Sequence, residues 1–195
     1  MAVVTTKSAS IINWDGNPIF IPSSGEGAPG RITGITSNLT GVVGDSIGSV
    51  YKLVRFPTNA KVKRLWVAQF GATGTSAGDI DVAFSDSLTD GTQAVFNSLA
   101  NPVVQVTGPV DNKLFGSAVT LNGAAAPVTA TDRTFQNTFT SAHADLPMWQ
   151  VLVNIGATQF VADPGGFFDI VIKLTTGVAV ANINYYAELD YIIGD

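Results

Sequence analysis

INYYAELDYII, residues 183–193, alternates apolar and polar side chains along its whole length. The residues at odd positions, from Ile183 to Ile193, face one way, and the polar side chains of Asn184, Glu188 and Asp190 face the other. A period of two residues is typical of a β-strand with one face in a core and the other toward water. This stretch therefore predicts a half-buried strand near the C-terminal end.

Similar signals recur along the chain. They predict strands at 50–56, 61–70, 80–84 and 168–174, with weaker ones at 103–107, 118–121 and 151–155. Within 61–70 we expect Val62, Trp66, Ala68 and Phe70 to share the buried face. Short helices are expected at 92–99 and from Asp145, where Pro147 follows in the first turn. About eight short strands separated by turns predict an all-β fold, an antiparallel β-sandwich of jelly-roll type over residues 45–195.

The composition fits an oligomeric β-protein. Of 195 residues, 46% are hydrophobic and only 13% are charged, which excludes intrinsic disorder. The chain has no Cys, so disulfides and thiolate metal sites are excluded. A net charge of −5 disfavours nucleic acid and anionic membranes as partners. We expect no membrane span and no signal peptide, and the scarce surface charge predicts an obligate homo-oligomer.

The sequence holds no recognisable catalytic constellation. Residues 25–30 spell Gly-x-Gly-x-x-Gly, but no helix or βαβ unit is predicted around them. His143 is the only histidine, no Gly-x-Ser-x-Gly elbow is present, and Glu26 and Glu188 are far apart. We therefore predict that the protein is not an enzyme and uses no cofactor.

Four carboxylates lie close together in sequence, at Asp79, Asp81, Asp86 and Asp90. Oxygen ligands at this spacing could bind Ca²⁺ at a subunit contact, although the EF-hand pattern is absent. The other interpretation is a solvated polar face of a strand.

Half of the ten cations lie within thirteen residues, in a predicted basic hairpin formed by Lys52, Arg55, Lys61, Lys63 and Arg64. In an acidic chain such a patch favours docking to an acidic partner or a neighbouring subunit. An ordinary solvated edge is the alternative.

Three stretches carry a resemblance to a known class of protein. The first is 44–60, in which Tyr-Lys-Leu-Val-Arg-Phe-Pro runs into Thr-Asn-Ala and then a basic strand. The second is Gly-Asp-Ile-Asp-Val-Ala-Phe-Ser-Asp at 78–86. The third is Leu-Pro-Met-Trp-Gln-Val-Leu at 146–152, together with the closing aromatic strand. In these stretches the chain resembles virion proteins of tailed bacteriophages that are encoded beside the major capsid protein.

The resemblance implies a capsid decoration (cement) protein that binds the outside of the head and stabilises the shell. Such proteins are often trimers at local threefold positions, so it implies a homotrimer, the major capsid protein as partner, and synthesis in the host cytoplasm. An alternative is a receptor- or carbohydrate-binding module of a phage fibre. In that case Trp14, beside a predicted turn at 15–18, would stack on a sugar.

Residues 1–44 differ from the rest, because their apolar residues form short clusters without a sustained period, and Gly and Pro recur between residues 16 and 44. We predict an extended N-terminal arm that adds to a neighbouring subunit or to the capsid lattice. Its expected anchors are Ile12, Trp14, Ile19 and Phe20. The alternative is an arm that folds back onto its own sandwich.

Overall fold

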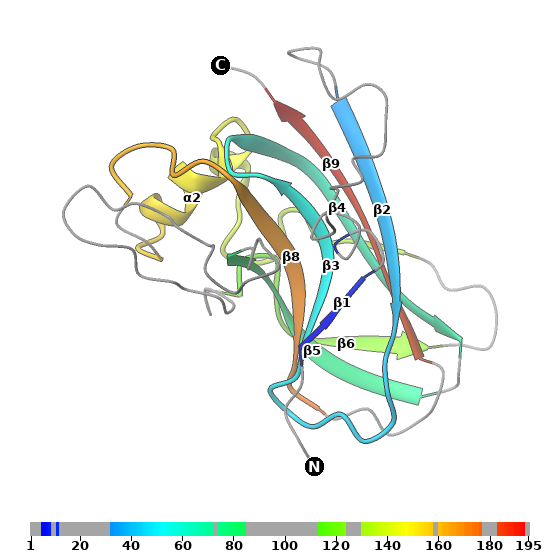
Figure 1. The fold of residues 1–195 in the computed structure, drawn as a ribbon. Helices are drawn as coiled ribbons and strands as arrows, with labels where there is room; N and C mark the ends of the chain where they lie inside the picture. Colours follow the sequence, from blue (N-terminus) through cyan, green and yellow to red (C-terminus); the bar gives the residue numbers. More distant parts are fainter. Residues whose placement is uncertain are drawn as a thin grey trace, which may run out of the picture.

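Two β-sheets pack face to face in the structure, a computed structural model (Figure 1). It describes residues 5–8, 11, 32–71, 74–84, 113–123, 130–157, 160–176 and 183–193. The first sheet has five strands in the order β1-β3-β8-β5-β6. These strands are β1 (Thr5–Lys7), β3 (Val50–Pro57), β8 (Phe167–Leu174), β5 (Gly74–Phe84) and β6 (Gly116–Gly123).

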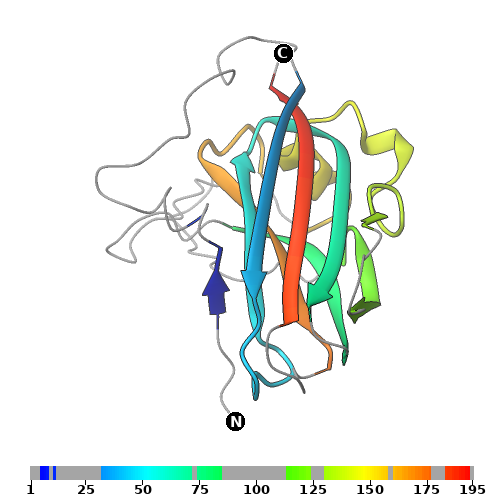
Figure 2. The same cartoon turned by 90° about the vertical axis from the view of Figure 1, so that its right-hand side faces the viewer.

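The second sheet has four strands in the order β2-β9-β4-β7. They are β2 (Ile32–Thr40), β9 (Ile183–Ile193), β4 (Ala60–Gly71) and the short β7 (Thr131–Asp132). In Figure 2, β2, β9 and β4 lie side by side as long antiparallel strands. The all-β sandwich predicted from the sequence is confirmed.

Apolar side chains from both sheets fill the space between them. Every second residue of β9, from Ile183 to Tyr191, is buried, and β8 contributes Phe168, Ile170, Ile172 and Leu174. The rings of Tyr51 on β3 and Tyr185 on β9 stack across the two sheets with centroids 4.9 Å apart. The alternation predicted for 183–193 and 168–174, and for Ile80 and Val82, therefore describes the core correctly.

A β-bulge in β3 changes which side chains share a face. Lys52 pairs with Val171 and Val54 with Ile170, so Leu53 is an extra residue between two regular pairs. Residues three positions apart normally lie on opposite faces of a strand. Because of the bulge, Lys52 and Arg55 both lie on the outer face of the five-stranded sheet.

A second bulge, in β4, corrects the predicted orientation of Trp66. The register against β9 shifts between Val62 and Arg64, and Trp66 then pairs with Glu188 on the outer face. Leu65 and Val67 fill the core instead. The prediction that Trp66 shares the buried face of Val62 was wrong, because a strict period of two does not continue through a bulge.

The predicted arm needs correction where it is described. β1 pairs in parallel with β3, and β2 pairs with β9 over nine residues as a strand of the sandwich. In these parts the chain folds back onto its own sheets, so the sandwich begins well before residue 45. The proposed anchors Ile12, Trp14, Ile19 and Phe20 lie outside the described residues.

The described part of the chain contains the 3₁₀ turn η1 (Ser141–His143) and the helix α2 (Met148–Asn154), and Ile11 also has a helical conformation. The strand predicted at 151–155 was wrong, because Met148, Val151 and Leu152 are buried at helical spacing. Pro147 precedes the helix, so Asp145 is not its N-cap. The elements predicted at 92–99 and 103–107 lie outside the described part of the chain.

Candidate functional site

An apolar loop tip lies at one end of the sandwich, in the connection between β2 and β3. Val42, Val43 and Ile47 expose 59%, 53% and 64% of their surface, and we call these three residues the apolar loop tip. Exposed apolar side chains that gather in one short loop can mark an interaction site.

Backbone hydrogen bonds fix the shape of this loop. Its ends are attached to both sheets, since the Gly41 amide donates to the Ile183 carbonyl at 2.7 Å and the Gly48 amide donates to the Leu174 carbonyl at 2.8 Å. Gly44 and Gly48 have φ angles of 92° and 90°, a region that residues with a side chain rarely adopt. The chain therefore turns at its glycines and presents the apolar residues between them.

A buried polar contact anchors the middle of the loop. The hydroxyl of Tyr51 donates to Oδ2 of Asp45 at 2.6 Å, and both side chains are buried. Burial raises the pKa of Tyr51, and the hydrogen bond to Asp45 raises it further. The ring of Tyr185 stacks on that of Tyr51, and its hydroxyl lies 3.0 Å from Oγ of Ser76. The Ser76 hydroxyl in turn donates to Oε1 of Gln69.

This arrangement suits binding more than chemistry. A loop that is already ordered loses little conformational entropy when a partner covers it, so more of the binding energy appears as affinity. The apolar loop tip offers no titratable side chain on its exposed surface. The apolar loop tip can contribute apolar contact area and a fixed shape to binding, and these properties favour a protein surface as its partner.

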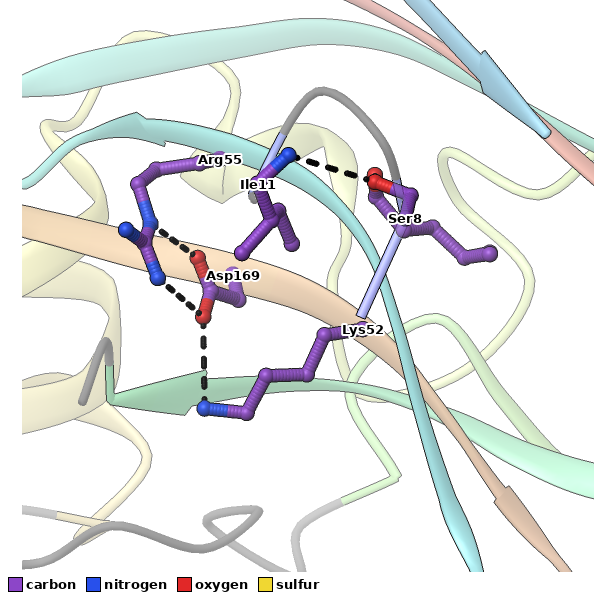
Figure 3. A network of polar contacts seen from close by, with 6 residues as sticks. Ser8, Ile11, Lys52, Arg55 and Asp169 are labelled. Atoms are coloured by element: carbon purple, nitrogen blue, oxygen red, sulfur yellow. Dashed lines mark hydrogen bonds and ion pairs between the residues drawn. The ribbon is translucent and has the colours of Figure 1, made fainter. Parts of the chain in front are cut away.

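A buried ion cluster lies on the outer face of the five-stranded sheet (Figure 3). Nε and Nη2 of Arg55 donate to the two carboxylate oxygens of Asp169, at 2.7 and 3.1 Å, and Nζ of Lys52 is 3.4 Å from Oδ2. Ser8 and Ile11 are buried beside it, and Ser8 Oγ donates to the carbonyl of the bulge residue Leu53. All three charged side chains are at least 98% buried.

This cluster corrects the predicted basic hairpin. Lys52 and Arg55 form buried ion pairs with the carboxylate of Asp169, so they do not present a cationic surface to a partner. An unpaired charge in such a place would be costly, and Asp169 supplies the compensation. Their assignment as contact residues on an exposed hairpin was therefore wrong.

The other three cations of the predicted hairpin lie on β4. Lys63 Nζ is 2.7 Å from Asp145 Oδ1, and its hydrogen bond lowers the pKa of that carboxyl group. Arg64 pairs with Asp190 at 2.7 Å and with Glu188 at 3.3 Å. Lys61 is half-buried. Much of this positive charge is therefore neutralised within the chain, and a role in partner contact stays a prediction.

Trp66 lies beside these cations on the outer face of the four-stranded sheet. The guanidinium of Arg64 lies 5.3 Å from the centroid of its ring, a cation–π contact. The guanidinium therefore lies over one face of the indole ring. Trp14, the residue on which the carbohydrate-binding alternative depends, lies outside the described residues.

Asp79 and Asp81, the described members of the acidic group, accept hydrogen bonds from the backbone. Asp81 is buried and accepts from the amides of Val82, Lys113 and Leu114, at 2.8, 2.9 and 3.2 Å. Asp79 accepts from Ala118 at 2.6 Å. These carboxylates join β5 to the segment leading into β6. Within the described residues no group of three or more potential ligands could hold a metal ion.

His143 belongs to the η1 turn. Its Nδ1 accepts a hydrogen bond from the Thr140 amide at 3.1 Å, and its ring packs 5.8 Å from that of Phe139. These contacts give it a role in the local turn.

None of the described helices is long and apolar enough to cross a membrane.

Comparison with protein-family models, with curated proteins and with solved structures gave no match to this chain.

Proposed function

We propose that this chain is a decoration (cement) protein of a tailed bacteriophage head, which binds the outer surface of the shell and stabilises it. The sequence resemblance at 44–60, 78–86 and 146–152 supports this, as does an all-β sandwich whose charged groups are largely paired internally. The partners are the major capsid protein and further copies of the chain, with three copies in the unit that the resemblance implies.

One observation carries the proposal, namely the rigid apolar loop tip. A contact that is already ordered gives more affinity for the shell, because little conformational entropy is lost on binding. Val42, Val43 and Ile47 supply apolar area, and the Asp45–Tyr51 hydrogen bond holds their loop in place. We propose that this end of the sandwich faces the capsid.

We propose further that the sandwich has jelly-roll topology. The order β2-β9-β4-β7 opposes β3-β8-β5-β6, with β1 added at one edge. From β2 to β5 the chain changes sheet at each step, and it does so again from β6 to β9. Two interleaved four-stranded sheets of this kind are typical of jelly rolls.

The test is binding to shells. Purified heads that lack the protein are mixed with the full chain and sedimented, and the amount bound is measured against the major capsid protein by quantitative mass spectrometry. We expect saturation at a fixed ratio to the capsid protein and a higher melting temperature of the decorated heads. Absence from purified virions, or no cosedimentation, would overturn the proposal.

Paired variants locate the contact. Val43→Ser with Ile47→Ser removes two side chains of the apolar loop tip and should weaken binding strongly. Val161→Ser is the matched control, because Val161 is 66% exposed but precedes β8, at the opposite end of the sandwich from the loop. Equal binding by both variants would contradict the proposed orientation, provided circular dichroism shows both to be folded.

A further inference from the structure

Three of the four outer edges of the two sheets are protected from pairing with another chain. β1 has three residues and β7 has two, which is too short to offer a useful ladder. β6 is irregular, because its register against β5 shifts and Ala118 has a φ of 44°. Short strands and bulges are the usual devices by which proteins block edge pairing.

The fourth edge, β2, has none of these protections. It runs for nine residues, ITGITSNLT, without a charged residue or a proline, and its pairing with β9 has no bulge. Among the described residues it pairs with β9 alone. A long, regular and uncharged edge is a template for strand addition.

The ladder to β9 shows which backbone groups of β2 face outward. The Gly41 amide donates to Ile183, so odd-numbered residues of β2 point their amides and carbonyls toward β9. The amides and carbonyls of Gly34, Thr36, Asn38 and Thr40 therefore point away from the sheet. Among the described residues, these groups form an unpaired edge.

We propose that this edge pairs with β2 of a second copy of the chain, antiparallel and about a twofold axis at Ser37. Thr36 of one copy then lies opposite Asn38 of the other, and Gly34 lies opposite Thr40. Each of these is a pair of outward-facing residues, so their hydrogen bonds are complementary. The result is one continuous sheet of eight strands through both copies.

Two features favour a second copy as the occupant. Self-pairing brings residues 34–40 of β2 against the same stretch of the second copy, and a strand without charges meets no like charge in doing so. In this register Ile32 of one copy lies opposite Val42 of the other, and these side chains are 65% and 59% exposed in the single chain. Val42 directly follows Gly41, whose amide makes the hydrogen bond to Ile183 of β9. Two exposed apolar side chains at opposite ends of the edge are thus covered reciprocally.

This inference does not rest on the proposed capsid role, although Val42 belongs both to the apolar loop tip and to the paired edge. A twofold contact joins copies in pairs, and in a protein built from trimers it would join two trimers. We therefore expect the purified chain to have two or six times its single-chain mass of 20.3 kDa by light scattering. A mass of one or three chains at micromolar concentration would overturn the inference, whatever the result of the shell-binding test.

Charge variants test the register. Thr36 and Asn38 are both exposed, so substitutions there leave the core intact. Thr36→Lys with Asn38→Lys places lysine opposite lysine twice across the axis, whereas Thr36→Lys with Asn38→Glu places opposite charges there. Like charges directly opposite on a sheet are destabilising, so the dissociation constant of the first variant should exceed that of the second about tenfold. Equal dissociation constants would refute this register.

Crosslinking gives a second readout. The chain has no cysteine, so Thr36→Cys with Asn38→Cys introduces the only thiols. Mild oxidation should give a disulfide-linked dimer in high yield, while Ser117→Cys, exposed on β6, should remain a free thiol. Comparable crosslinking of both variants would indicate random collision and would contradict the proposed pairing.

Discussion

Arg55 and Asp169 lie directly opposite each other on β3 and β8, and the guanidinium contacts both carboxylate oxygens in a bidentate pair. The pair is buried on the outer face of a sheet whose inner face is the apolar core. Lys52 reaches the same carboxylate because the bulge at Leu53 brings it to that face. One carboxylate thus compensates two buried cations.

Asp169→Asn should therefore destabilise the protein strongly. It leaves two cations buried without this counter-charge, and breaking a buried ion pair typically lowers the free energy of unfolding by about 3–5 kcal/mol. Urea unfolding followed by circular dichroism measures the loss. Asp145→Asn is the control, because it removes the exposed partner of Lys63 and should leave the unfolding midpoint close to that of the unmodified chain. Equal midpoints for the two variants would contradict the structural role of Asp169.

Ser8→Ala tests whether the N-terminal segment is part of the sandwich. The Ser8 hydroxyl donates to the Leu53 carbonyl and accepts from the Ile11 amide, in a buried setting. Without it the carbonyl at the bulge lacks this donor, which lowers the free energy of unfolding by about 1–3 kcal/mol. Hydrogen exchange of the Ser8 amide, bonded to Lys52, should also accelerate. Unchanged stability and exchange would show that this segment is dispensable to the fold.

The strands that the sequence predicted best are those with an uninterrupted period of two. β5, β8 and β9 alternate without a bulge in the stretches used for the prediction, so their inward faces could be read directly. β3 and β4 each contain an extra residue, and a bulge leaves no simple mark in a single sequence. That is why Trp66 was predicted to face inward. Lys52 and Arg55 lie on the outer face as cations were expected to, but they are buried there beside Asp169, Ser8 and Ile11, which no local pattern reveals.

β2 was missed for a different reason. Its inward residues include Thr33 and Ser37 beside Ile35 and Leu39, so the alternation of hydrophobicity is weak. The run of Thr and Ile, which have high β-propensity, was the available signal. The apolar loop tip also had a signal, because Val42, Val43 and Ile47 lie between three glycines. Glycines at this spacing predict a turn, and side chains in a turn are usually exposed. Its anchoring by Tyr51 depends on tertiary contacts that no local pattern contains.

Gly48→Ala tests the preorganisation of the loop. Gly48 has a φ of 90°, and forcing a residue with a Cβ into a left-handed conformation costs about 1–2 kcal/mol. The apolar loop tip keeps its composition in this variant but loses its fixed shape. We expect a lower melting temperature together with weaker shell binding at temperatures where the variant is fully folded. Shell binding at the unmodified affinity would show that apolar area alone is sufficient.

Alkaline pH should weaken the fold through the same anchor. Burial raises the pKa of Tyr51, with a further contribution from Asp45, and burial also raises the pKa of Tyr185. In the unfolded chain tyrosine titrates near pH 10, so the native state holds these protons more tightly than the unfolded state does. The corresponding stability is complete below about pH 10 and is lost as the pH rises above it.

The free energy of unfolding, measured in urea between about pH 8 and 11, should fall steeply for the unmodified chain and less steeply for Tyr51→Phe. Tyr186→Phe is the control: burial and the hydrogen bond to Glu188 also raise the pKa of Tyr186, but this side chain is only half-buried, so its removal should change the slope less. A slope unaffected by Tyr51→Phe would mean that the hydroxyl is not held by Asp45 in the native loop.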